Sequence, residues 1–430
     1  MANDVETYRQ KLCTPAQAAA IVRSGDHLVF PICAGEPTSF VKALAARKRE
    51  LAGVVVNQQH HLCPAYLDAE SPPHIKLNSW FTSAVSRKAV QQGWADFVPN
   101  HFHEVPKLLR EYWPIDVVGT VVSPMDEDGF FTCSLSVAYT MAALEKARQV
   151  VVEVKPGAPR TSGDCKIHVS KVDCIIESSE PVFELASPPL SPVEEAIGGH
   201  IAELIEDGST LQLGIGGMPN AVCQALQRKR DLGIHTEMIT DGMVDLMRCG
   251  AVNNSRKRLN PGKTVGTFAL GTRRLYEFMH ENPGLEMYPV DYTNDPFNVG
   301  RNDKVVSINA TLEVDLLGQC CSEAIGSEQW SGTGGQVDFV RGANLSRGGK
   351  SFIATSSTAK KGTLSRIVPV LREGAVVTTG KNDVDQVVTE YGTAKLRGQT
   401  ARQRALNLIA VAHPDFRSEL TEAARKLKRI

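Results

Sequence analysis

The stretch Leu213-Gly-Ile-Gly-Gly-Met-Pro-Asn220 is the part of this chain that indicates its fold most directly. It overlaps the end of the apolar run Leu211–Ile215, which predicts a buried strand, and it precedes the helical pattern of Ala221–Lys229. A strand, a glycine-rich loop and a helix in this order are typical of α/β domains. The loop at such a junction offers unpaired N–H groups and the helix dipole to an anion. A tight turn that needs glycine for packing fits the spacing equally well.

The loop differs from the two common nucleotide-binding motifs. Pro219 stands where the dinucleotide fingerprint G-x-G-x-x-G needs its third glycine, and the Gly-Lys-Ser/Thr of a Walker loop is missing. These differences argue against a nucleotide-dependent dehydrogenase and against a P-loop protein.

Apolar runs alternate with helical patterns along the whole chain. Many of the runs are apolar throughout, which suits parallel strands covered by helices on both faces. We therefore expect an α/β fold with mostly parallel sheets. The predicted strands are Val54–Asn57, Val117–Val122, Val150–Val154, Leu211–Ile215, Val305–Ile308, Phe352–Thr355 and Ala375–Thr379. The predicted helices are Thr140–Arg148, Val193–Glu206, Ala221–Lys229 and Thr400–Val411.

The length of 430 residues predicts two domains of about 200 residues each. The proline-rich stretch Ser187–Pro192 places the boundary, so we predict domains over residues 1–187 and 188–430. Ser24–Ile32 resembles Asp207–Ile215, with Gly25 opposite Gly208. A second echo aligns Ile115–Gly119 with Val314–Gly318. The shared order of these echoes predicts an internal duplication.

Composition excludes several classes of protein. The net charge is −1, without a basic face for a nucleic acid. No apolar stretch is long enough for a membrane span, and the N-terminus lacks the pattern of a secretory signal. The ten cysteines form no Cys-x-x-Cys pair, which argues against a metal or disulfide framework. We expect a cytoplasmic enzyme with reduced thiols and neither a nucleic-acid nor a membrane partner.

Glu237 is the candidate nucleophile. It ends the segment Gly233–Glu237, the predicted strand after the glycine loop, and functional groups gather at the carboxyl ends of strands in open α/β sheets. Its neighbours Ile234, Met238 and Ile239 are apolar. Partial burial would strip water from the carboxylate and make it a better nucleophile. A solvated surface glutamate is the ordinary alternative.

Three further features could complete a site. The cluster Ser331-Gly-Thr-Gly-Gly-Gln-Val-Asp-Phe339 could supply N–H groups to an oxyanion, an effect of about 3 kcal/mol per donor. Lys360 follows the predicted strand Phe352–Thr355 and could reach a phosphate, and Asn309 could hydrogen-bond the carboxylate of Glu237. The alternatives are a flexible loop, a surface lysine and a turn-forming asparagine. The histidines at 60, 61, 101 and 103 lack metal-ligand spacing and are expected to pack or to line a pocket, and Glu36 is a further pocket-lining candidate.

These motifs, taken together, resemble the acetyl-CoA hydrolase/transferase family of CoA-transferases over essentially the whole chain. Within the family, the chain is most similar to the 4-hydroxybutyrate, butyrate:acetate and itaconate CoA-transferases. Two departures concern Lys155-Pro156, where relatives often carry Asn-Pro, and Ser331, where one branch carries Asn. The matching segments are Leu213–Val222, Gly233–Met238, Ser331–Phe339, Val384–Gly392, Leu396–Gly398, Ala412–Arg417, Val122–Asp126, Pro159–Asp164 and Ile167-His168.

The resemblance implies a function for each motif. Glu237 would attack an acyl-CoA to give an acyl-glutamyl anhydride and then a glutamyl-CoA thioester, from which a second carboxylate takes the CoA. Gly335 would stabilise the oxyanion, and Asn309 would position Glu237. The chain would use coenzyme A as a substrate, without a permanent cofactor or metal. The residues implied to line CoA are Gly214, Ile215, Gly216, Gly217, Met218, Gly334, Gly335 and Lys360.

The implied architecture is two similar open α/β domains with the active site at their interface, in a homodimer or a higher homo-oligomer. Two alternatives stay open at this point. An acyl-CoA hydrolase would use the same glutamate with water as the acceptor. A non-catalytic acyl-CoA-binding protein would keep the glycine loops without needing Glu237.

Overall fold

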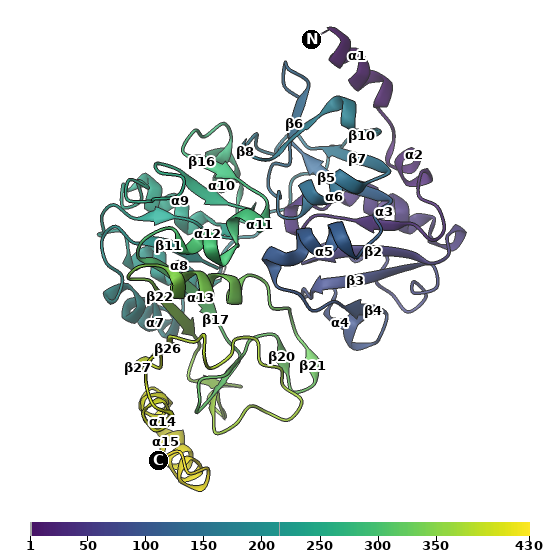
Figure 1. Cartoon of the computed structure of the whole chain (residues 1–430). Helices are drawn as coiled ribbons and strands as arrows, with labels where there is room; N and C mark the ends of the chain where they lie inside the picture. The colour runs from purple at the N-terminus through teal and green to yellow at the C-terminus, as the bar shows by residue number, and fades with distance from the viewer. Residues whose placement is uncertain (1, 215) are drawn as a thin grey trace. The chain divides into compact units, whose positions relative to one another are not determined.

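The structure, a computed structural model, describes residues 2–214 and 216–430 (Figure 1). It divides into two compact units. The first comprises Met1–Ala186 and Val265–Thr293, and the second comprises Ser187–Thr264 and Asn294–Ile430. Each unit is built around its own parallel sheet.

The first unit contains a seven-stranded sheet with the order β10-β7-β5-β1-β2-β3-β4, in which every neighbouring pair is parallel. All six residues of β5 are buried, as expected for a strand covered on both faces. The strands are β1 (His27–Val29), β2 (Val54–Gln59), β3 (Ile75–Phe81), β4 (Ala95–Phe97), β5 (Val117–Val122), β7 (Gln149–Val154) and β10 (Cys174–Glu177). The helices are α1 (Ala2–Lys11), α2 (Pro15–Ala20), α3 (Thr38–Ala46), α4 (Arg87–Gln91), α5 (Val105–Glu111), α6 (Thr140–Lys146), α10 (Arg273–Met279) and α11 (Val290–Thr293).

The second unit contains a six-stranded sheet with the order β12-β11-β17-β22-β26-β27, parallel except for the hairpin of β26 and β27. Helices α7 and α13 contact this sheet. The strands are β11 (Thr210–Leu213), β12 (Gly233–Ile234), β17 (Val305–Ala310), β22 (Lys350–Ala354), β26 (Gln386–Thr389) and β27 (Gly392–Lys395). The helices are α7 (Pro192–Glu203), α8 (Gly217–Ala225), α9 (Asp241–Arg248), α12 (Pro296–Gly300), α13 (Gln336–Leu345), α14 (Ala401–Ala410) and α15 (Pro414–Lys426).

Shorter elements connect these sheets and helices. The short strands are β6 (Phe130–Thr132), β8 (Ser162–Gly163), β9 (Lys166–His168), β13 (Met238–Ile239), β14 (Thr264–Gly266), β15 (Phe268–Ala269), β16 (Leu285–Met287), β18 (Glu313–Asp315), β19 (Cys320–Cys321), β20 (Ala324–Ile325), β21 (Glu328–Gln329), β23 (Thr358–Ala359), β24 (Leu364–Ser365) and β25 (Ile367–Val368). The 3-10 helices are Cys33–Gly35, Lys48–Glu50, Phe102–Glu104 and Val169–Lys171.

The predicted α/β class with mostly parallel sheets is confirmed, and one predicted strand is wrong. Ala375–Thr379 forms a loop in which Val376 and Val377 are 40% and 47% exposed. Within it, Thr379 makes an isolated bridge to Cys320. An apolar run becomes a strand only where a sheet can pair with it, and here β26 occupies the place beside β22.

The two large sheets share one strand order. The run β10-β7-β5-β1-β2 in the first corresponds to β26-β22-β17-β11-β12 in the second. Gly25 and Gly208, which precede β1 and β11, both have positive φ angles of +83° and +76°. Their N–H groups donate to Ala52 O and Arg230 O, just before β2 and β12. This is the pattern expected of an internal duplication, which stays a prediction.

The second sequence echo does not match this correspondence. It aligns the start of β5 with β18, whereas the strand in the place equivalent to β5 is β17. Strand β18 belongs to a separate three-stranded sheet with β19 and β25. The echo between Ile115–Gly119 and Val314–Gly318 is therefore wrong as a structural equivalence.

The proline-rich stretch at the predicted boundary ends where helix α7 begins. Ser191 caps α7, its hydroxyl accepting from Glu194 N while the Glu194 carboxylate accepts from Ser191 N, and Pro192 occupies the first helical position. The compact units divide next to the predicted boundary, between Ala186 and Ser187.

The compact units differ from the predicted contiguous domains in the segment Val265–Thr293, which belongs to the first unit. Its backbone pairs with that unit: Ala269 N donates to Leu135 O over 2.8 Å, and β16 runs parallel to β8. Pairing between such distant segments leaves no local pattern, so a contiguous division could not include it.

Candidate active site

Glu237 lies at the carboxyl edge of the second unit's sheet, just after β12. The preceding residues continue alongside β11: His235 N donates to Leu211 O over 3.1 Å, and Thr236 Oγ1 donates to Leu213 O over 3.2 Å. Because β11 and β12 are parallel, Glu237 and the glycine loop that follows Leu213 lie at the same edge of the sheet. The structure thus brings these two predicted features to one edge.

Two N–H donors hold the Glu237 carboxylate. Asn294 Nδ2 donates to Glu237 Oε2 over 2.9 Å, and the backbone N–H of Gly335 also donates to this carboxylate. Gly335 is the N-terminal cap of α13, so the carboxylate also benefits from the helix dipole. The N–H predicted to serve an oxyanion therefore faces the predicted nucleophile.

Gly335 must be glycine because of space. Its φ of −92° suits any residue, but a Cβ at this position would overlap both Glu237 Oε2 and Asn294 Nδ2. The missing side chain is what lets the carboxylate approach the backbone.

The surroundings of Glu237 raise the pKa of its carboxyl group to about 7. Burial is the largest cause, and repulsion from Asp338 adds to it, whereas the hydrogen bonds from Asn294 and Gly335 act in the opposite direction. A half-buried carboxylate that is poorly hydrated yet partly ionised at neutral pH is suited to attack an electrophile.

The glycine loop is shaped by two steric requirements. Gly216 caps α8 with a φ of +111°, which favours glycine, and a Cβ on Gly217 would collide with the carboxylate of Glu194. Ile215 lies outside the described residues. The role of Gly214–Met218 in holding CoA stays a prediction, since a packing turn accounts for the same glycines.

Asn309 does not make its expected contact. Its Nδ2 donates instead to Gln212 Oε1 over 3.2 Å and to Ser307 Oγ over 2.8 Å, which ties β17 to β11. The amide that reaches Glu237 is that of Asn294, which sequence reasoning missed. Asn294 precedes Asp295, the cap of α12, so the local pattern signals a helix start and nothing more.

The structure also places the remaining predicted residues. Lys360 is exposed at the turn of the hairpin formed by β23 and β24, with a φ of +47°, and its contact with CoA stays a prediction. Gly334, which precedes Gly335, has a φ of +55°. In the first unit, the buried Glu36 carboxylate accepts from Gln58 Nε2 and from two backbone N–H groups.

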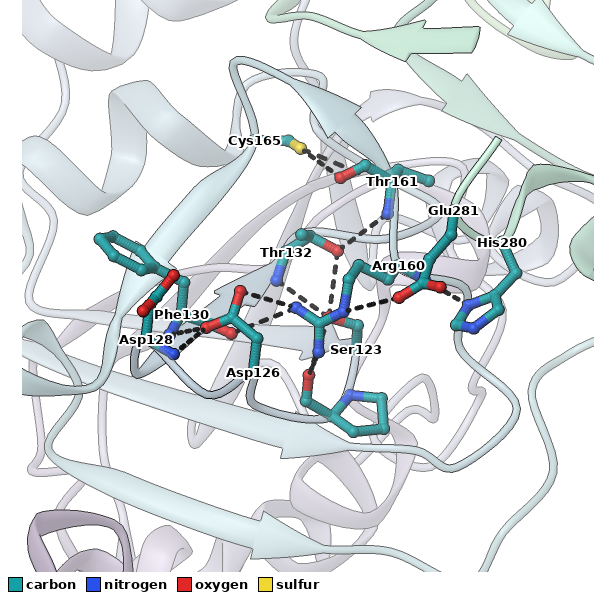
Figure 2. Close-up of polar contacts among 11 residues, drawn as sticks. Ser123, Asp126, Asp128, Phe130, Thr132, Arg160, Thr161, Cys165, His280 and Glu281 are labelled. Atoms are coloured by element: carbon teal, nitrogen blue, oxygen red, sulfur yellow. Dashed lines mark hydrogen bonds and ion pairs between the residues drawn. The ribbon is translucent and has the colours of Figure 1, made fainter. Parts of the chain in front are cut away.

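Two family motifs of the first unit meet at an ion pair (Figure 2). Arg160 Nη1 donates to Asp126 Oδ2 over 3.0 Å, and the same carboxylate accepts from the backbone of Phe130 over 2.7 Å. Glu281 N donates to Arg160 O, which ties the segment Val265–Thr293 to this pair. These contacts assign the two motifs a structural role within the first unit.

The described residues contain no helix that is long and apolar enough to cross a membrane. Over the same part of the chain, no group of three or more His, Cys, Asp or Glu side chains is arranged to hold a metal ion.

Family models match both halves of the chain. The acetyl-CoA hydrolase/transferase N-terminal domain matches residues 2–185, and the C-terminal domain of the same family matches residues 271–424. The chain belongs to the acetyl-CoA hydrolase/transferase family.

Individual relatives support this assignment. The chain is 72% identical to a succinyl-CoA:cyclohexane-1-carboxylate CoA transferase of Geobacter metallireducens, over 98% of this chain and 97% of the relative. It is 48% identical to a 4-hydroxybutyrate coenzyme A transferase of Clostridium kluyveri, over 98% and 99%. The crystal structure of RipA from Yersinia pestis matches with a TM-score of 0.94 and 41% identity, over 99% of this chain and 100% of RipA. These matches confirm the prediction of an enzyme of the CoA-transferase class.

Proposed function

We propose that this enzyme moves CoA from succinyl-CoA to a cyclic or short-chain carboxylate through a glutamyl-CoA thioester on Glu237. The observation that carries the proposal is the half-buried Glu237 carboxylate, with its raised pKa and two N–H donors. The substrates are suggested by the 72% identical relative, whose name gives succinyl-CoA and cyclohexane-1-carboxylate. Acetate, butyrate, 4-hydroxybutyrate and itaconate are further candidate acceptors.

The first half-reaction loads the enzyme. A Glu237 oxygen attacks the thioester carbonyl, the C–S bond breaks, and the electron pair leaves on the CoA thiolate, giving an acyl-glutamyl anhydride. The thiolate then attacks Cδ of Glu237, and the anhydride C–O bond breaks to release the first carboxylate. CoA is now joined to Glu237 as a thioester.

The second half-reaction reverses these steps with another carboxylate. The acceptor attacks Cδ of Glu237 and expels the CoA thiolate, which then attacks the acceptor's carbonyl and frees the glutamate. One thioester is exchanged for another, so the exchange requires no input of ATP.

The two donors on the Glu237 carboxylate are suited to the steps at Cδ. When a nucleophile adds to Cδ, negative charge grows on a carboxyl group that already accepts from Asn294 Nδ2 and from the Gly335 N–H. Each such donor contributes about 3 kcal/mol in comparable sites.

Trapping the covalent intermediate tests the proposal. Wild-type enzyme and Glu237→Ala are incubated with succinyl-CoA, and the intact mass is measured before and after borohydride reduction. We expect a CoA adduct that maps to Glu237 and is missing in the variant. Full transferase activity in Glu237→Ala would sink the proposal.

A panel of acceptors separates the substrate classes. CoA release without any acceptor measures hydrolysis, and transfer to cyclohexane-1-carboxylate, acetate, butyrate, 4-hydroxybutyrate and itaconate measures preference. Release of CoA at the same rate with and without acceptors would identify a hydrolase.

A further inference from the structure

We infer that Asp338 is a positioning residue: its carboxylate holds the Asn294 amide so that the N–H side of that amide faces Glu237. This inference rests on the proposed function, because it concerns the same nucleophile. Asp338 lies within the motif Ser331–Phe339, but the sequence pattern assigned no role to its side chain or to that of Asn294.

Asn294 Nδ2 lies between two carboxylates. It is 2.9 Å from Glu237 Oε2 and 3.5 Å from Asp338 Oδ2. An amide nitrogen carries two hydrogens and accepts no hydrogen bond, so it can serve both oxygens at once. If the amide rotated by half a turn, its oxygen would face both negative groups. The Asp338 carboxylate therefore favours the orientation in which the Asn294 amide donates to Glu237.

The burial of the three groups strengthens this preference. Asn294 and Asp338 are 0% and 1% exposed, and Glu237 is half-buried. Charge–dipole interactions are less screened in such surroundings than in water. A 3.5 Å separation is long for a hydrogen bond, so Asp338 acts mainly through the field that it exerts on the amide.

A helix-stabilising role is the ordinary alternative for Asp338. It lies in the first turn of α13, where the helix dipole favours an acidic residue. That role requires no buried position beside a second carboxylate. Asp338 also repels the ionised form of Glu237, which is an electrostatic cost that a purely structural acid could avoid on an exposed face.

The two explanations predict different couplings. A residue that acts through Asn294 matters for catalysis only while the Asn294 amide is present, whereas a helix-stabilising residue matters regardless of it. A double-mutant cycle measures this dependence.

The cycle compares wild type, Asp338→Asn, Asn294→Ala and the double variant by kcat for transfer from succinyl-CoA. We expect Asp338→Asn to lower kcat about tenfold or more in the wild-type background, with the KM for succinyl-CoA changed less than about twofold. In the Asn294→Ala background the same substitution should lower kcat less than about twofold. Equal losses in both backgrounds would overturn the inference.

Two further variants complete the design. Asp415→Asn, in the first turn of α15, is the matched control and should leave kcat unchanged. If Asp338→Asn does not fold, the cycle is run with Asp338→Glu, which keeps the charge but moves the carboxylate by one methylene. A loss confined to the background that retains Asn294 supports the inference, and an equal loss in both backgrounds contradicts it.

Trapping on Glu237 keeps the two proposals separate. If wild type forms no adduct and transfers no CoA, the proposed function fails. If wild type does both and the cycle is additive, the role of Asp338 alone fails.

Discussion

Asn294 Nδ2 lies 2.9 Å from Glu237 Oε2, although the whole segment Val265–Thr293, which belongs to the first unit, separates the two residues in the sequence. Asn294 is the residue at which the chain re-enters the second unit. This contact holds one oxygen of the candidate nucleophile in place.

The raised pKa of Glu237 predicts the pH dependence of the reaction. The attacking form is the carboxylate, so kcat/KM should fall as pH decreases through about 7, and by about tenfold for each further pH unit. A series from pH 5 to 9 with a control for enzyme stability measures it. A flat profile between pH 5 and 8 would contradict the assignment.

Replacing Glu237 with Gln should cost activity and increase stability. The pKa of this carboxyl group is higher in the folded state than its ordinary value of 4.5, so the folded protein binds the proton more tightly. The free energy of unfolding therefore decreases as pH rises from about 4.5 to 7, and the neutral amide removes this penalty.

We expect Glu237→Gln to lower kcat by at least about 10³-fold. The same variant should raise the free energy of unfolding by on the order of 1 kcal/mol at pH 8, with little change at pH 5. Chemical denaturation at both pH values measures the difference. A variant that is less stable than wild type at pH 8 would show that the carboxylate is not strained by its burial.

Gly335→Ala should disrupt the site through a single methyl group. The new Cβ would collide with Glu237 Oε2 and push the carboxylate off its donors, so we expect kcat to fall about 100-fold. The backbone angles suit alanine, so circular dichroism should show a folded protein.

Gly199→Ala is the matched control for this substitution. Gly199 lies within α7, where a Cβ would meet open space. It should keep full activity and gain up to about 1 kcal/mol in stability, since alanine favours a helix more than glycine. Comparable activity losses in both variants would show that the effect at Gly335 is not specific.

A buried ion pair predicts a stability effect in the first unit. Lys155 Nζ lies 3.2 Å from Glu153 Oε1, with side chains 4% and 0% exposed. Lys155→Met leaves the Glu153 carboxylate without its cation, which should cost about 3 kcal/mol. Glu153→Gln combined with Lys155→Met should recover at least half of that loss.

Arg49→Ala is the surface control, because the Arg49–Glu70 pair is 79% and 68% exposed. It should change the free energy of unfolding little. Denaturation curves for wild type, Lys155→Met, the double variant and Arg49→Ala measure these free energies of unfolding. An equal loss for Lys155→Met and Arg49→Ala would contradict the prediction.

Most of the fold could be predicted from local patterns. Val117–Val122 and Val305–Ile308 were recognisable as buried strands because most of their residues are valine or isoleucine. Ala375–Thr379 misled the same reasoning, because an apolar run does not reveal whether a neighbouring strand is there to pair with it.

The sequence by itself determined the α/β class and indicated a boundary near Ser187 and Glu237 and Gly335 as candidates, because these depend on periodicity and on motifs of adjacent residues. Only the tertiary structure decided that Asn294, and not Asn309, reaches Glu237. It also decided that the Asp338 carboxylate lies beside the Asn294 amide. Side chains from distant segments meet through the pairing and packing of whole elements. No local pattern encodes the distance between them, and that distance determines which donor holds the nucleophile.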